Sequence, residues 1–265
     1  MEHQTPTPIT GHTALICLLG SPCAHSISPM MHNASFEALG LDYRYLAFDV
    51  NEATLPTAVA GLKVLGARGF NLTMPDKNLM VSLCDDLSTA ARIIGAVNTV
   101  VNENGRLIGH NTDGIGYMQS VKDAGYDIID KKMTLLGAGG AATAILVQAA
   151  LDGLKEISVF VRPTSRFYDR LVHTVDELTK ITDCKIKICN FSDAELLKRE
   201  LADSAILTNG TSVGMAPHED TCPVPEDLVF PDGLIVSDII YNPRETRLLS
   251  MAKHQGNPFF NGSYM

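Results

Sequence analysis

Apolar runs and glycine-terminated segments alternate along the first half of the chain. The run TALICLLG at 13–20 is closed by a Gly-Ser-Pro sequence and predicts a buried strand. In the segment 28–40, Ser28 suits a helix cap, Pro29 the first turn and Gly40 the stop. The same alternation predicts three more elements: a strand at 42–50, a helix near 52–65 and a strand at 66–73.

A complete strand–helix–strand unit begins near residue 130. The pattern there predicts a strand at Met133–Leu136, a glycine-rich turn, a helix ending near Leu151 and a strand at Ile157–Val161. A helix near 192–202 and three strand-like runs follow, the runs being 184–191, 204–211 and 234–241. Strands that alternate with helices at this pace are typical of an α/β fold with largely parallel strands.

The restart of the pattern predicts a domain boundary between residues 114 and 131, with 116–125 as a connecting helix. We therefore expect two α/β domains, 1–117 and 118–241, with a cleft between them. Clefts between domains commonly hold ligands.

The composition is that of an ordinary globular protein, with 265 residues of which 45% are hydrophobic and 19% charged. The formal net charge of −9 argues against a nucleic-acid or anionic-lipid partner, since both need a basic face. The apolar run Ala14–Leu19 is far too short to span a membrane. The six cysteines include no CxxC pair, and the eight histidines show no metal-ligand spacing. We expect free thiols, no metal and a cytoplasmic location.

A glycine-rich turn follows the strand that ends at Leu136 and opens the next helix. Its sequence, Gly137-Ala138-Gly139-Gly140-Ala141-Ala142, fits the dinucleotide-binding pattern, in which glycine permits a tight turn and a close approach to pyrophosphate. The helix N-terminus adds unpaired N–H groups and a positive dipole. The alternative is a glycine-rich connection that binds no ligand. The strand–turn–helix context favours the binding site.

The second strand of this unit ends in the sequence VRPTSR at 161–166. A site for NAD usually has an acidic residue here that bonds the ribose 2′-hydroxyl, whereas a site for NADP has cations and hydroxyls for the 2′-phosphate. No Asp or Glu lies between Ile157 and Tyr168, but two arginines and two hydroxyls do. The pattern favours NADP, with NAD as an alternative, unless the arginines are ordinary solvated charges.

Short polar clusters stand just beyond apolar runs or glycines in the first domain, where loops carry function. Singly, each has an ordinary structural explanation: Ser28 as a helix cap, Asp113 as a turn residue and Lys77 as a surface cation. Together they offer hydroxyls, amides, one amine and one carboxylate, which suits a small polyhydroxylated ligand. The clusters lie at 26–28, 71–77, 98–99 and 111–114.

Seven motifs, in order along nearly the whole chain, resemble the shikimate dehydrogenase family and, within it, the quinate/shikimate dehydrogenase branch. They are GSPCAHSISPMMHN (20–33), FNLTMPDK (70–77), GAVNTVV (95–101), GHNTDGIG (109–116), LLGAGGAA (135–142), TNGTSVGM (208–215) and DIIYNP (238–243).

The resemblance implies reversible, nicotinamide-dependent reduction of 3-dehydroshikimate to shikimate, in chorismate and aromatic amino-acid biosynthesis, with quinate as a second substrate. It also implies a substrate-binding and catalytic domain, 1–117, to which the tail 242–265 returns. A Rossmann-like cofactor domain would occupy 118–241. We expect a monomer or a homodimer.

Carried over residue by residue, the resemblance implies that Lys77 and Asp113 form the catalytic pair. A lysine can pass a proton to and from the reacting oxygen while a carboxylate orients it. Ser26 and Ser28 resemble the hydroxyls that hold the substrate carboxylate. Further substrate contacts are implied for Asn71, Thr73, Asn98 and Tyr241. The implied cofactor residues are Gly137, Ala138, Gly139, Gly140 and Ala141 in the phosphate loop, Val161, Arg162, Thr164, Ser165 and Arg166 at the strand end, and Ile239 and Gly262 beside the nicotinamide.

The chain departs from the family pattern at three places. The asparagine that commonly precedes the arginine is missing before Arg162, which leaves the use of NAD open. Asp76 adds a carboxylate beside Lys77 that favours a charged lysine. The final glycine motif has Tyr264 in place of its second glycine, and the sequence ends before the family's substrate-binding glutamine, as expected of an incomplete chain.

Two other classes of protein fit parts of this pattern. A methylenetetrahydrofolate dehydrogenase would have a similar architecture, but the paired serines and the NTDG motif argue against it. A catalytically silent dinucleotide-binding protein would have no need of both Lys77 and Asp113. We therefore predict an NADP-dependent shikimate dehydrogenase, with the quinate/shikimate enzyme that uses NAD or NADP as the alternative.

Overall fold

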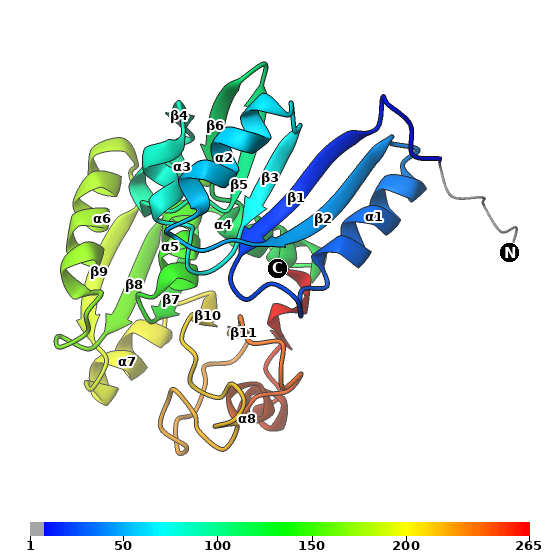
Figure 1. Cartoon of the computed structure of the whole chain (residues 1–265). Helices are drawn as coiled ribbons and strands as arrows, with labels where there is room; N and C mark the ends of the chain where they lie inside the picture. The colour runs from blue at the N-terminus through cyan, green and yellow to red at the C-terminus, as the bar shows by residue number, and fades with distance from the viewer. Residues whose placement is uncertain (1–7) are drawn as a thin grey trace, which may run out of the picture. The chain divides into compact units, whose positions relative to one another are not determined.

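The computed structural model describes residues 8–265, which form two compact units, one ending at Asn111 and the other beginning at Thr112 (Figure 1). Each unit contains its own six-stranded sheet with helices. The predicted α/β class with two sheet-based parts is thereby confirmed. The functional domains 1–117 and 118–241, with 242–265 returning to the first, stay a prediction.

The sheet of the first unit is mixed, with the strand order β2-β1-β3-β5-β6-β4. β1 is parallel to β2 and β3, as the alternating pattern led us to expect, whereas β5 is antiparallel to both β3 and β6. The β5–β6 pair is antiparallel because a short turn, not a crossover helix, joins the two strands. The strands are β1 (Ala14–Gly20), β2 (Tyr43–Asp49), β3 (Gly69–Leu72), β4 (Asp86–Leu87), β5 (Thr99–Glu103) and β6 (Arg106–His110).

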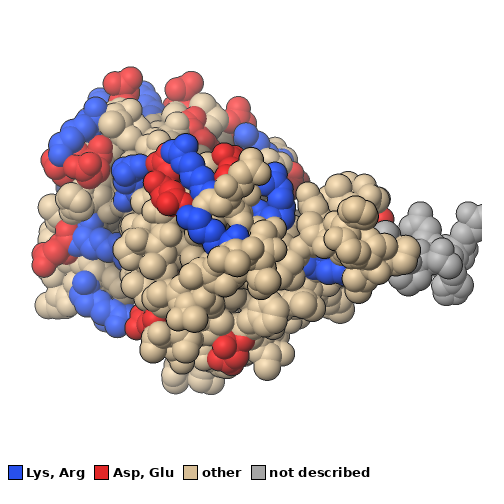
Figure 2. All heavy atoms as spheres, turned by 45° about the horizontal axis from the view of Figure 1, so that its top comes forward, with Lys and Arg blue, Asp and Glu red and all other residues tan. Residues whose placement is uncertain are grey.

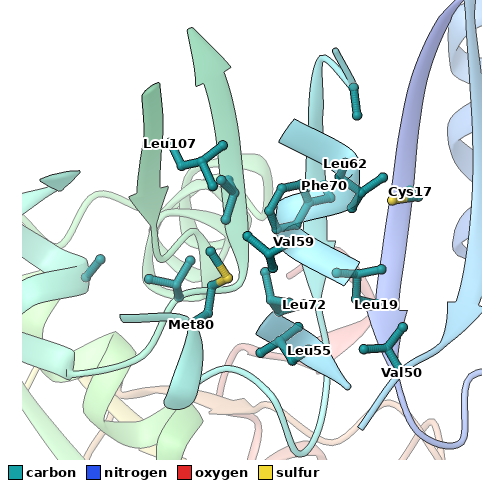
Figure 3. Packing of buried hydrophobic residues seen from close by; sticks show 14 residues of the cluster. Cys17, Leu19, Val50, Leu55, Val59, Leu62, Phe70, Leu72, Met80 and Leu107 are labelled. Atoms are coloured by element: carbon teal, nitrogen blue, oxygen red, sulfur yellow. The ribbon is translucent and has the colours of Figure 1, made fainter. Parts of the chain in front are cut away.

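Helix α2 (Leu55–Val64) packs its apolar stripe into the core of the first unit (Figure 3). Leu55, Val59 and Leu62 recur at steps of four and three residues, so they share one face of the helix, and all three are buried. Phe70 and Met80 belong to the same core cluster. The other helices of this unit are α1 (Ser28–Ala38), the 3-10 helix η1 (Leu79–Leu83) and α3 (Thr89–Ile94).

The start of helix α1 differs from the prediction. Ser28 is its first helical residue, and the capping position is Ile27, which makes no side-chain cap bond. The Oγ of Ser26 instead accepts a hydrogen bond from the Ser28 N–H at 3.2 Å. The predicted cap role of Ser28 is therefore wrong, because Ser28 is already helical and the capping position falls on Ile27. Gly40 follows the helix with a φ of +66°, as a stop residue should.

The sheet of the second unit is entirely parallel, with the strand order β12-β11-β10-β7-β8-β9. Counted from β7, this is the 3-2-1-4-5-6 order of dinucleotide-binding folds, and the order reverses between β7 and β10. Ligands of such sheets bind beyond the carboxyl ends of the strands at that reversal. The strands are β7 (Lys132–Leu136), β8 (Glu156–Val161), β9 (Lys185–Asn190), β10 (Ile206–Asn209), β11 (Ile235–Asp238) and β12 (Phe259–Phe260).

The helices of the second unit include one that the sequence analysis did not assign. In α6 (Tyr168–Ile181), Leu171, Thr174 and Leu178 are buried at steps of three and four residues, so its amphipathic pattern was a signal that we overlooked. The connecting helix predicted at 116–125 is α4 (Asp113–Asp123) and begins three residues earlier. The other helices are α5 (Gly140–Leu151), α7 (Ala194–Leu201), α8 (Arg247–Gln255) and the 3-10 helix η2 (Gly262–Tyr264).

Acidic and basic side chains lie next to one another over much of the face in Figure 2. Exposed ion pairs of this kind include Lys63 with Asp85 at 3.1 Å and Arg106 with Asp86 at 3.0 Å. Such pairs contribute little to stability, but they keep this face from carrying a patch of one sign. Between residues 8 and 265, none of the helices has the length and apolarity needed to cross a membrane.

Candidate active site

The carboxyl ends of β1 and β3 bring two predicted loops together in the first unit. The Thr73 N–H donates to the carbonyl of Leu19 at 2.9 Å, and the Ser21 N–H donates to the carbonyl of Met74 at 3.1 Å. A Cβ at Gly20 would collide with the Thr73 side chain, so only glycine allows this close approach. Thr73 is thereby fixed beside the loop that leads to Ser26.

Lys77 and Asn98 lie at the same edge of the sheet. Lys77 belongs to the turn after β3, and its carbonyl accepts a hydrogen bond from the Val97 N–H at 2.8 Å. The Asn98 N–H donates to the carbonyl of His110 at 3.0 Å, and the Asn98 carbonyl accepts from Leu72 at 2.9 Å. Because β5 is antiparallel to β3, its first residues meet the last residues of β3. An amine, an amide and the Thr73 hydroxyl therefore gather at one edge.

Ser26 and Ser28 stand at the N-terminal end of α1 and are both half-buried. The loop before the helix is held by a bond from the Ser26 N–H to the Cys23 carbonyl at 3.0 Å. Two hydroxyls at a helix N-terminus suit an anionic group, because the first N–H groups and the helix dipole point toward it. The predicted contact of this pair with the substrate carboxylate stays a prediction.

Asn71 has its side-chain amide engaged inside the protein. Its Oδ1 accepts from Tyr45 Oη at 2.8 Å, and its Nδ2 donates to the Asn98 carbonyl at 3.2 Å and to Thr99 Oγ1 at 3.0 Å. The structure thus shows Asn71 in an internal network. Its predicted contact with the substrate stays a prediction.

Asp113 and Tyr241 belong to the second unit. Asp113 is the first residue of α4, where the helix dipole stabilises a carboxylate. The helix is fixed by Gly114, at which a Cβ would collide with the Ala144 carbonyl of α5. It is also fixed by Tyr117 Oη, which shares hydrogen bonds with Thr208 Oγ1 at 2.5 Å and Ser237 Oγ at 2.9 Å. Tyr241 lies in the loop after β11 and is exposed.

The glycine turn lies between β7 and α5, at the strand-order reversal. Gly137 has a φ of +101°, which only glycine adopts readily, and Gly139 is the capping residue of α5. At Gly139 and Gly140, an added Cβ would meet no described protein atom within 4 Å. The protein's own packing therefore does not explain these two glycines. A phosphate group that approaches the backbone closely does explain them, so the turn fits a dinucleotide. The turn also contains Ala138, which is buried, and Ala141.

The end of β8 places the predicted 2′-phosphate residues in one loop. Val161 is the last strand residue and is buried, whereas Arg162 and Thr164 are exposed. The loop is closed by a bond from the Ser165 N–H to the Arg162 carbonyl at 2.9 Å. Arg166 lies over the ring of Phe167 at 4.7 Å. Cations and hydroxyls therefore meet at the strand end, as an NADP site requires.

The two residues predicted beside the nicotinamide touch each other. Gly262 lies so close to Ile239 that an added Cβ would collide with the Ile239 carbonyl. The Gly262 N–H also donates to the carbonyl of Ile240 at 3.2 Å. Glycine is therefore required at this position by backbone packing within the second unit.

Two buried carboxyl groups lie near predicted site residues. Burial and the charge of Glu52 raise the pKa of Asp76, whose two oxygens have no hydrogen-bond partner in the described part of the chain. Burial and the charge of Glu52 therefore both oppose the ionisation of Asp76. Burial raises the pKa of Asp238 to about 6, although bonds from Ile240, Thr246 and Asn209 favour its charged form.

Three residues of the hydrogen-bond networks near the candidate site were not predicted from the sequence: Tyr45, Asn33 and Asp238. Tyr45 and Asp238 are buried, and Asn33 bonds to the backbone of Tyr45, and a single sequence gives little signal for such contacts. A tyrosine in a strand next to polar clusters was the only available signal. Within residues 8–265, no group of three His, Cys, Asp or Glu side chains is placed to hold a metal ion.

Known proteins are similar to this chain over nearly its whole length. The family model described as the shikimate dehydrogenase substrate binding domain matches residues 18–100. The shikimate dehydrogenase (NADP(+)) of Listeria monocytogenes serotype 4b is 51% identical over 263 residues, which are 99% of this chain and 90% of that protein. The quinate/shikimate dehydrogenase of Escherichia coli O139:H28 is 41% identical over 254 residues, 96% of this chain and 88% of that one.

A solved structure agrees with these relatives. The crystal structure of shikimate 5-dehydrogenase from Listeria monocytogenes in complex with shikimate and NAD has a TM-score of 0.93 at 51% identity, and the match covers 97% of this chain and 89% of that one. The resemblance predicted from seven motifs is thus confirmed by identity along the full chain. This chain belongs to the shikimate dehydrogenase family.

Proposed function

We propose that this chain catalyses the reversible, NADP-dependent reduction of 3-dehydroshikimate to shikimate, a step of aromatic amino-acid biosynthesis. The observation that carries the proposal is the 51% identity, over 263 residues, with an NADP-dependent shikimate dehydrogenase. The protein is an oxidoreductase that acts on a CH–OH group of a small molecule. The residues gathered at the polar edge of the first unit supply the chemistry such a substrate needs.

Lys77 and Asp113 are the proposed catalytic pair. Reduction of the ketone leaves an oxygen that needs a proton, and oxidation of the alcohol needs a base for the same oxygen. A lysine ammonium gives that proton and the neutral amine takes it back. Asp113 orients the lysine and accepts a hydrogen bond from a ring hydroxyl, an interaction that its charge strengthens.

Ser26 and Ser28 are proposed to bind the substrate carboxylate, with support from their place at the start of α1. Thr73 and Asn98 are proposed to bind ring hydroxyls, since both lie at the sheet edge beside Lys77. Asn71 and Tyr241 are the remaining proposed contacts. Together these residues would hold a polyhydroxylated ring by hydrogen bonds from several directions, which orients the reacting carbon.

The second unit fits a dinucleotide. Residues 137–141 would hold the pyrophosphate through backbone N–H groups, and Ile239 and Gly262 would border the nicotinamide. When bound, the nicotinamide supplies or accepts the hydride. Arg162, with Thr164, Ser165 and Arg166, would bind the 2′-phosphate of NADP. NAD remains the alternative cofactor, since the structure of the Listeria relative contains it.

Quinate is the second candidate substrate, favoured by the 41% identity with a quinate/shikimate dehydrogenase. Quinate carries one more ring hydroxyl and a saturated ring, so it needs more room and another partner near the serine pair. The higher identity with the shikimate enzyme makes shikimate the better substrate in this proposal.

We also infer a cytoplasmic protein that acts as a monomer or a homodimer, without a nucleic-acid or membrane partner. Six free cysteines support a reducing compartment. The net charge of −9 supports the absence of a polyanionic partner.

The test is an absorbance assay at 340 nm with shikimate and quinate, each with NAD and NADP. We expect shikimate with NADP to give the highest kcat/KM of the four pairs. A clear excess for quinate would change the substrate, and an excess for NAD would change the cofactor. No turnover with any pair would overturn the proposal.

A further inference from the structure

A continuous line of hydrogen bonds runs through the first unit from a buried tyrosine to Asn98. Tyr45 Oη donates to Asn71 Oδ1 at 2.8 Å, Asn71 Nδ2 donates to Thr99 Oγ1 at 3.0 Å, and Thr99 Oγ1 donates to Asn98 Oδ1 at 3.0 Å. Tyr45 belongs to β2, Asn71 to β3 and Thr99 to β5. The line crosses the sheet and ends at a side chain of the polar edge.

The direction of this line follows from donor and acceptor chemistry. Asn71 Nδ2 lies 3.2 Å from the carbonyl oxygen of Asn98, which can only accept a hydrogen bond. The nitrogen end of the Asn71 amide therefore faces β5, and its oxygen end faces Tyr45. Tyr45 has to be the donor, and burial raises the pKa of its phenol above the ordinary value, so the hydroxyl keeps its proton.

The origin of the line is rigid. Tyr45 is 1% exposed, and the ring of His32 stacks on it with centroids 4.4 Å apart. The side chain of Asn33 accepts from the Tyr45 N–H and donates to the Tyr45 carbonyl, both at 2.9 Å. A tyrosine held on its ring and on both backbone groups gives the hydrogen-bond line a fixed starting point.

We propose that Tyr45, Asn71 and Thr99 are positioning residues that fix the side-chain amide of Asn98. They hold its oxygen toward Thr99 and thereby fix the orientation of the amide group. This inference rests on the proposed function, which places Asn98 against a ring oxygen.

The test removes the hydroxyls one at a time and measures steady-state kinetics with shikimate and NADP. Thr99→Val keeps the branched shape and loses the hydroxyl, and we expect KM for shikimate to rise about five- to tenfold while kcat falls less than threefold, as for the loss of one hydrogen bond. Thr99→Ser restores the donor and should restore KM to within about twofold of the unmodified value. Tyr45→Phe acts through two intervening bonds, so we expect a smaller rise of about two- to fourfold.

The matched control is Tyr43→Phe, in the same strand. Tyr43 makes an edge contact with the ring of Phe36 and is outside the hydrogen-bond line, so KM for shikimate should stay the same. A double-mutant cycle then separates positioning from general structural damage. If Thr99 acts through Asn98, Thr99→Val should add nothing to the KM of an Asn98→Ala variant. Thermal unfolding of each variant shows which of them are folded.

The outcomes are distinguishable. If Asn98→Ala raises KM but neither Thr99→Val nor Tyr45→Phe does, the positioning role is overturned and the proposed function stands. The positioning role is also overturned if Thr99→Val raises KM by the same factor in the unmodified protein and in the Asn98→Ala variant. If Asn98→Ala leaves KM for shikimate unchanged, the proposed role of Asn98 in substrate binding is wrong, and the positioning role of Tyr45, Asn71 and Thr99 is then also wrong. If Thr99→Val does not fold, Tyr45→Phe decides by the same criteria.

Discussion

The candidate cofactor site in the second unit consists mainly of backbone, whereas the candidate substrate site in the first unit consists of side chains. In the glycine turn after β7, Gly139 and Gly140 offer main-chain N–H groups at the start of α5. At the polar edge of the first unit, Thr73 and Lys77 come from the loop after β3 and Asn98 comes from the loop before β5, and the sheet brings the two loops together. A diphosphate needs N–H donors and close approach, while a polyhydroxylated ring needs many different polar groups.

This difference predicts which substitutions each site tolerates. Backbone donors are lost only when a new Cβ blocks the approach, so the second unit should be sensitive at glycines. Side-chain donors are lost by any truncation, so the first unit should be sensitive at its polar residues.

The largest expected effect is at the catalytic pair. Lys77→Ala should lower kcat about 10²- to 10⁴-fold, the usual contribution of a positioned acid–base group, with KM for NADP unchanged. Asp113→Asn should lower kcat and also raise KM for shikimate, because it weakens a charge-assisted bond. Both constants are measured in the 340 nm assay.

The matched control for the lysine is Lys63→Ala in α2. Lys63 forms an exposed ion pair with Asp85, so its loss should change kcat less than about twofold. An unchanged kcat in Lys77→Ala would show that the polar edge does not perform the chemistry.

The second effect concerns stability in the second unit, which contains the buried carboxyl of Asp238. Its pKa is raised from 3.8 to about 6 by burial. Between pH 4 and pH 6 this carboxyl binds more protons in the folded protein than in the unfolded chain, so its contribution to the free energy of unfolding falls by roughly 2–3 kcal/mol as the pH rises through that range. Above that window the contribution is constant.

Asp238→Asn should remove this pH-dependent contribution. The check is urea unfolding at several pH values, with the exposed Asp232→Asn as the control variant. We expect the free energy of unfolding of Asp238→Asn to rise relative to that of the unmodified protein between pH 4 and pH 6, because only the unmodified protein loses stability as this carboxyl ionises. A constant difference across that range contradicts the raised pKa.

The third effect is on cofactor choice. One charge-assisted bond from Arg162 to a phosphate contributes about 1.5–3 kcal/mol, or roughly a 10- to 150-fold preference for NADP, and exposure places the effect toward the lower end. Arg162→Ala should raise KM for NADP and leave NAD kinetics nearly unchanged. Arg199→Ala in α7 is the exposed control. A variant that kept its NADP preference would make Arg162 an ordinary surface charge.

The smallest effect compares two glycines in open space. A Cβ at Gly139 or at Gly61 would meet no described atom within 4 Å, so alanine fits at both positions. Gly139→Ala should raise KM for NADP about tenfold, because the methyl group blocks the phosphate. Gly61→Ala lies in α2 and should stabilise the protein by about 0.5–1 kcal/mol without changing KM. Equal KM values in both variants would remove the phosphate argument.

Local sequence signals explain why much of the fold could be predicted. The glycine turn at 137–142 and the strands around it were visible because each signal occupies neighbouring residues. The antiparallel β5 and β6 were not assigned, since their pairing depends on the sheet around them. Lys77 and Asp113 were found through motif resemblance, and their roles stay predictions.

The hydrogen-bond line to Asn98 shows what the sequence could not provide. Tyr45 and Asn71 are 26 residues apart in the chain, and only the register of β2, β1 and β3 makes their side chains meet. The cap of α1 was assigned to Ser28, although the capping position is Ile27, because a serine directly before Pro29 satisfies the local cap pattern. Contacts between distant residues and choices between equivalent neighbours require the three-dimensional structure.

The most direct test of the contrast between the two sites is a crossed binding measurement by titration calorimetry. Shikimate and NADP are each titrated into the unmodified protein, into Ser28→Ala and into Gly139→Ala. We expect Ser28→Ala to weaken shikimate binding at least about fivefold, as for one lost hydrogen bond to a charged group, and to leave NADP binding unchanged. We expect Gly139→Ala to do the reverse. If either variant weakened both ligands equally, or if the unmodified protein bound neither, the account would be contradicted.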